Sequence, residues 1–64
     1  MFRRNVRREV ELSLQRWGIS NAEQLSARLG LPRRRVEDAL VQLRQSGRAQ
    51  REGRRPVTWR MVSA

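Results

Sequence analysis

Hydrophobic residues near the N-terminus recur with a helical spacing. Five of them are separated by four, four, four and three positions: Phe2, Val6, Val10, Leu14 and Trp17. At about 100° per residue these side chains fall on one stripe. The pattern predicts an amphipathic helix that ends before Gly18 and buries this stripe, while Leu12 lies on the opposite side.

The stretch "ISNAEQLSARLG" predicts a second, shorter helix over residues 21–29. Ala22, Leu25, Ser26 and Leu29 share one face of this helix. Its expected start is a capping box, in which Ser20 and Glu23 satisfy free backbone N–H groups. Its expected end is Gly30, because glycine adopts the left-handed conformation that commonly closes a helix.

A third helix is predicted over residues 32–46, with Pro32 at its first position, where a fixed φ and a missing N–H cost little. Gly47 is expected to terminate the helix. Val41 points away from the apolar stripe. The stripe itself is formed by four residues with helical spacing: Val36, Ala39, Leu40 and Leu43.

The hydrophobic period changes from helical to alternating after Gly47. Val57, Trp59 and Met61 alternate with residues of the opposite face, which predicts a strand. A preceding short strand with Ala49 facing inward, and a turn around Gly53, complete a predicted β-hairpin. Because an isolated hairpin is marginal in water, it has to pack on the helices. Trp59 lies on the apolar face of this strand, and Trp17 lies on the apolar stripe of the first helix. Both tryptophans are predicted to be core residues for that reason.

The composition excludes several classes of function. The chain has 64 residues, no cysteine and no histidine, so a single domain over residues 1–64 is expected. Disulfides, thiolate metal sites and the usual general base near neutral pH are absent. No constellation of Ser, Asp or Glu replaces them. We therefore expect no enzymatic activity, no metal, no cofactor and no small-molecule ligand.

The formal net charge is +9, and all fifteen basic residues are arginine. Such a balance favours nucleic acid as a partner, with an anionic membrane surface as the second choice. Arginine offers a planar, permanently charged fork that suits phosphate and guanine. No apolar run is long enough to span a membrane, and Glu9 and Glu11 interrupt the N-terminal segment. A cytoplasmic location is therefore expected.

The order of predicted elements resembles the winged helix-turn-helix family. The stretch "QLSARLGLPRRRVEDALVQLRQSGR" is similar to the helix-turn-helix core, and the basic hairpin after Gly47 is similar to the wing. The resemblance implies an α+β fold of three helices with a C-terminal β-hairpin wing. It also implies double-stranded DNA binding, with the third helix in the major groove and the wing on the backbone or minor groove. The family includes small stand-alone prokaryotic and phage regulators, and a transcriptional regulator of this kind is the role that we expect, although the family by itself does not imply a specific role.

Under this resemblance the DNA-contacting residues belong to the third helix and the wing. They are Arg33, Arg34, Arg35, Asp38, Arg51, Arg54 and Arg55. On a helical wheel Arg34 points furthest from the core, with Arg33 and Arg35 to either side. An alternative is a self-neutralising helix, in which the pairs Arg33–Glu37 and Arg34–Asp38 each stabilise the helix by a few tenths of a kcal/mol, roughly.

Further alternatives remain open from the sequence. The third helix or the wing could dock on an acidic protein without reading DNA. The N-terminal amphipathic helix could bind an anionic membrane. A homodimer could form through Leu12 or Val41, which are expected to be exposed apolar residues. The arginines at positions 3, 4, 7 and 8 could add a separate phosphate-binding patch.

Overall fold

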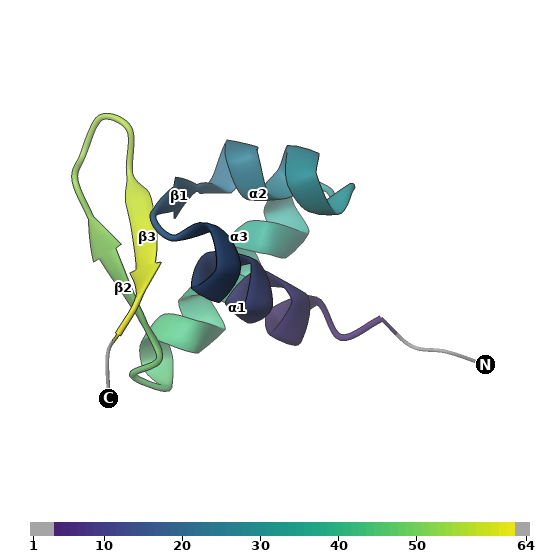
Figure 1. Cartoon of the computed structure of the whole chain (residues 1–64), viewed down its shortest axis with the longest axis horizontal. Helices are drawn as coiled ribbons and strands as arrows, with labels where there is room; N and C mark the ends of the chain where they lie inside the picture. Colours follow the sequence, from purple (N-terminus) through teal and green to yellow (C-terminus); the bar gives the residue numbers. More distant parts are fainter. Residues whose placement is uncertain (1–3, 63–64) are drawn as a thin grey trace.

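The computed structural model describes residues 4–62, which form three helices and a three-stranded antiparallel sheet. In chain order the elements are α1 (Val6–Trp17), β1 (Ser20–Asn21), α2 (Ala22–Leu29), α3 (Arg33–Gln45), β2 (Ala49–Glu52) and β3 (Thr58–Met61). Figure 1 shows the β2–β3 hairpin standing at one side of the three helices. The predicted architecture, three helices followed by a β-hairpin wing, is confirmed.

The first helix begins later than the hydrophobic stripe predicts. It starts at Val6, because the side chain of Asn5 accepts a hydrogen bond from the backbone N–H of Arg8 at 3.1 Å and caps the helix. Arg4 therefore precedes the helix. Its guanidinium pairs with Glu9 at 2.9 Å and donates to the carbonyl oxygen of Leu29 at 2.7 Å, which ties the N-terminal segment to the end of α2. Phe2 and Arg3 lie outside the described residues.

The predicted capping box of α2 is wrong by one position. Asn21 is the N-cap, and it exchanges hydrogen bonds with Gln24: the Asn21 side chain accepts from the Gln24 N–H at 2.7 Å, and the Gln24 side chain accepts from the Asn21 N–H at 2.9 Å. Ser20 cannot fill that role because it is buried in β1. Gly30 closes the helix in the left-handed conformation, as predicted.

The third helix agrees with the prediction to within one residue at each end. Pro32 is the N-cap rather than the first helical residue, and its carbonyl oxygen accepts from the N–H groups of Arg35 and Val36. The helix ends at Gln45, and Gly47 follows with a φ of 74°. All four stripe residues of the prediction are buried.

The sheet contains one strand that the sequence pattern does not predict. The order is β1-β3-β2, and β1 pairs Ser20 with Trp59 and Asn21 with Thr58. A two-residue strand carries no alternating pattern, so it has no signature along the chain. Its effect is considerable, because it joins the segment before α2 to the inner strand of the wing and leaves β3 paired on both sides.

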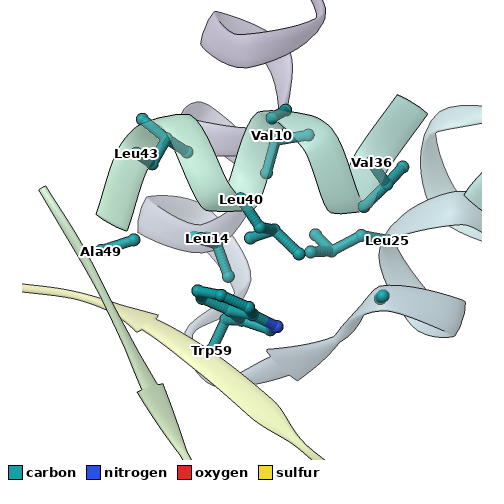
Figure 2. Packing of buried hydrophobic residues seen from close by; sticks show 10 residues of the cluster. Val10, Leu14, Leu25, Val36, Leu40, Leu43, Ala49 and Trp59 are labelled. Atoms are coloured by element: carbon teal, nitrogen blue, oxygen red, sulfur yellow. The ribbon is translucent and has the colours of Figure 1, made fainter. Parts of the chain in front are cut away.

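The core lies between the helices and the inner face of the wing. Figure 2 shows Trp59 beneath Leu14 and Leu40, with Leu25 on one side of the ring and Ala49 near the base of the hairpin. Trp59 is only 8% exposed, and Leu25 and Leu40 are fully buried. The core placement of Trp59 and the inward position of Ala49 are therefore confirmed.

The core placement predicted for Trp17 is wrong, since 58% of this residue is exposed. Trp17 lies on the same side of α1 as Val10 and Leu14, but it is the last residue of the helix, and Leu14 is the last residue of α1 that other elements bury. The spacing of a stripe indicates the direction in which a side chain points. It does not indicate whether another element extends far enough to cover that side chain. Leu12 and Val41 are exposed, as predicted.

Candidate nucleic-acid interface

An open groove lies between α3 and the wing. One wall is α3, the other is the β2–β3 hairpin, and the start of α2 closes one end. Trp59 forms the base of the groove: this residue packs into the core and also lines the groove. Three of the residues named from the sequence line this one concave surface: Arg33, Arg51 and Arg54.

The α3 wall is formed by one row of side chains. Arg33, Glu37 and Val41 are spaced by four residues, so they lie above one another on the same face of the helix. The Nε of Arg33 donates to a carboxylate oxygen of Glu37 at 2.8 Å. Both side chains are more than half exposed, so the pair fixes the direction of the guanidinium more than it stabilises the fold.

The wing wall is formed by Arg51 on β2 and by residues of the turn that follows, including Arg54 and Pro56. The turn depends on Gly53, whose φ is 73°, and a Cβ atom there would come within 3.1 Å of the carbonyl oxygen of Pro56. The Thr58 hydroxyl donates to the Glu52 carbonyl oxygen at 2.9 Å and holds the base of the turn. These contacts present Arg51 and Arg54 toward the groove.

The charges of the groove are mixed, with a positive excess. Three guanidinium groups line it, from Arg33, Arg51 and Arg54, against the two carboxylates of Glu23 and Glu37. One of these carboxylates is already engaged by Arg33. The unengaged positive charge therefore lies mainly on the wing side, whereas the middle of the α3 wall offers a carboxylate and the exposed apolar side chain of Val41.

The seven residues predicted to contact DNA do not form one cluster. Arg33, Arg51 and Arg54 line the groove. Arg35 and Asp38 lie on the other flank of α3, in a shallow depression shared with Arg7 of α1.

The remaining two, Arg34 and Arg55, are exposed and do not line the groove. Of the two ion pairs expected on α3, Arg33–Glu37 is present, whereas Arg34–Asp38 is not among the ion pairs of residues 4–62.

Several groove residues were not predicted to belong to a site. Val41 was predicted to be an exposed apolar residue and a candidate dimer contact, although its i+8 spacing from Arg33 places both on one helix face. Asn21 and Glu23 reach the groove because β1 pairs with β3. That long-range pairing has no signal in the local sequence pattern.

Residues 4–62 contain neither a candidate metal cluster nor a candidate membrane span. No cluster of acidic residues in this range could hold a metal ion. None of the three helices is both long and apolar enough to cross a bilayer.

No protein-family profile matches this chain, and no curated protein matches it significantly. Comparison with solved structures finds a similar fold. A Zalpha domain of PKZ from Carassius auratus, solved in complex with Z-DNA, is similar to this chain with a TM-score of 0.84. The alignment covers 89% of this chain and 92% of that domain, with 23% sequence identity. The chain therefore has the winged-helix fold of Zalpha domains.

Proposed function

We propose that this protein binds double-stranded DNA through the groove between α3 and the wing. The observation that carries the proposal is the convergence of Arg33, Arg51 and Arg54, from two separate elements, on one concave surface. Guanidinium forks match phosphate oxygens in geometry and charge. The complex of the similar Zalpha domain with Z-DNA supports the same class of ligand.

The proposed mechanism has two parts. The net charge of +9 attracts the duplex over a distance set by ionic strength. The wing arginines then bind one phosphate backbone while α3 enters a groove of the duplex, where Arg34 is the residue of the third helix that points furthest from the core. Occupancy of DNA would itself regulate transcription, and a small transcriptional regulator is the role that we propose.

A second candidate is docking of the same groove on an acidic protein. The observation that favours it is the exposed apolar side chain of Val41 on the α3 wall, in the same groove as Arg51 and Arg54. A phosphate backbone offers no partner for Val41, whereas an acidic protein can supply apolar side chains for Val41 and carboxylates for the arginines. Measured affinity for duplex DNA separates the two candidates.

The test is a salt titration of binding to duplex DNA. Each phosphate contact releases counterions, so with about four contacts the affinity should fall by roughly two orders of magnitude between about 50 and 200 mM salt. The panel should include a random-sequence duplex and an alternating CG duplex chemically held in the left-handed form. A flat salt dependence, or no binding to either duplex at low salt, would contradict the proposal.

A further inference from the structure

A second surface lies on the α1–α2 side of the molecule. We call it the Trp17 patch, and it is formed chiefly by Leu12, Arg16, Trp17, Arg28 and Leu29. None of these residues lines the groove between α3 and the wing. Trp17 and Leu12 are 58% and 49% exposed, and together with the half-buried Leu29 they make this a mainly apolar depression.

The cationic part of the patch is held in place by buried groups. One Nη of Arg28 donates to the hydroxyls of Ser13 and Ser20 at 3.4 and 3.3 Å, and both serines are buried. The same guanidinium lies 5.0 Å from the centre of the Trp17 ring, and that of Arg16 lies 5.5 Å from it. Arg28 retains further N–H donors, so its fork is oriented before any ligand arrives.

This arrangement selects one kind of occupant. Tryptophan and arginine are the residues that most often dominate the energy of protein interfaces. Two guanidinium groups beside an apolar surface complement carboxylates beside an apolar side chain. Glu9 also lines the patch. It does not repel such a ligand strongly, because its carboxylate is paired with Arg4.

Two other occupants fit less well. A second copy of the chain would bring another net charge of +9, and its own Arg16 and Arg28, against the patch. Nucleic acid would place phosphates over the apolar side chains of Leu12 and Leu29. The patch is also much smaller than the roughly 20–30 residues that each partner contributes to an interface between folded domains. A short segment is the better match.

We propose that the Trp17 patch docks a short acidic and apolar segment of a partner protein while the groove remains free. The protein would then bind two ligands at once and link the ligand of the groove to that partner protein. This proposal does not depend on DNA being the ligand of the groove.

The experiment uses the full chain and a synthetic set of ten-residue peptides. One series combines leucine with aspartate and glutamate at varied spacings, a second replaces the acids by lysine, and a third replaces the leucines by serine. We expect members of the first series alone to bind. NMR amide shifts on binding should concentrate around Leu12, Trp17 and Arg28.

Matched variants separate the patch from the groove. Trp17→Ala and Arg16→Gln should each weaken peptide binding by about tenfold, the usual scale for a central interface residue. Val41→Ala and Arg54→Gln remove the same kinds of side chain from the groove and should leave peptide affinity within about twofold. Arg28 is not substituted, since its loss would leave two buried hydroxyls without that donor.

Four outcomes would overturn the proposal. They are the absence of binding by every acidic peptide to the folded protein, shifts confined to the groove, equal losses for Arg16→Gln and Arg54→Gln, and displacement of the peptide from the patch by duplex DNA. The last of these would assign the patch to nucleic acid. A failure of DNA binding in the salt titration would leave the peptide result unaffected, so the two proposals fail separately.

Discussion

The two tryptophans of this chain lie in regions that look alike along the sequence and differ in space. Trp59 occupies the inner face of the wing, where Leu14, Leu25 and Leu40 surround it and it forms the base of the groove. Trp17 ends α1 in solvent, between the guanidinium groups of Arg16 and Arg28. Both residues continue an apolar stripe, so the stripe alone does not tell a core residue from a surface one.

The difference shows what each region contributes. On the Trp59 side, arginines from α3 and the wing line one groove, and the buried ring of Trp59 forms the base of that groove. On the Trp17 side, the ring itself is the surface, and buried serines orient the arginine beside it. In the first region the buried ring supports the groove that the arginines line, and in the second region the ring is itself exposed on the surface.

The largest effect that would test this contrast is on stability. Trp59→Ala should destabilise the fold by about 3–5 kcal/mol, because it removes a buried aromatic side chain. A core of this size rarely supplies more than about that amount, so the variant should be largely unfolded. Trp17→Ala should change stability by only about 1 kcal/mol or less, the scale of exposed cation–π contacts.

Thermal unfolding followed by circular dichroism measures both variants. If Trp59→Ala melted close to the parent temperature, or if Trp17→Ala lost as much stability as Trp59→Ala, the assignment of one ring to the core and the other to the surface would be wrong.

The next-largest effect concerns the recognition of DNA sequence by α3. If α3 enters a groove of the duplex, Arg34→Ala should lose about 1–3 kcal/mol on a duplex selected for tight binding and less on a scrambled one, because base contacts carry the specificity. Binding isotherms on both duplexes at one salt concentration give the ratio. An unchanged ratio would mean that Arg34 supplies charge only.

The smallest effect compares single charges from the two regions. Arg54→Gln should weaken binding to all duplexes by roughly threefold to tenfold and lower the salt slope by about one unit, as expected for a phosphate contact. Arg16→Gln removes the same charge from the Trp17 patch and should stay within about twofold. Equal losses would indicate that net charge, and not the position of the groove, determines affinity.

Much of the fold could be predicted from local sequence signals. The buried stripe of α3, its end near Gly47 and the turn at Gly53 were all predicted, because helical periodicity and the positive φ of glycine are properties of short segments. The start of α1 and the capping residues of α2 were predicted less accurately. Asn5 and Asn21 compete with neighbouring polar residues for the capping positions, and the choice depends on which residue the tertiary structure leaves extended.

The candidate site could be predicted only in part. Arg33, Arg51 and Arg54 share the groove, and their contact with DNA stays a prediction. Arg35 and Asp38 share α3 with Arg33 but lie on its other flank beside Arg7. A run of charges in a helix is spread around the axis by the 3.6-residue turn, so neighbours in sequence face different surfaces.

The sequence by itself determined the three helices, the hairpin, their order and the large positive charge, since these depend on contacts within a few residues or on composition. Only the tertiary structure decided that β1 pairs with β3, that Trp59 is covered while Trp17 is not, and that Arg28 is held between two buried serines. The physical reason is the separation along the chain between the residues that make contact. Burial and pairing depend on segments far apart along the chain, and no local pattern records which distant side chain will cover a given residue.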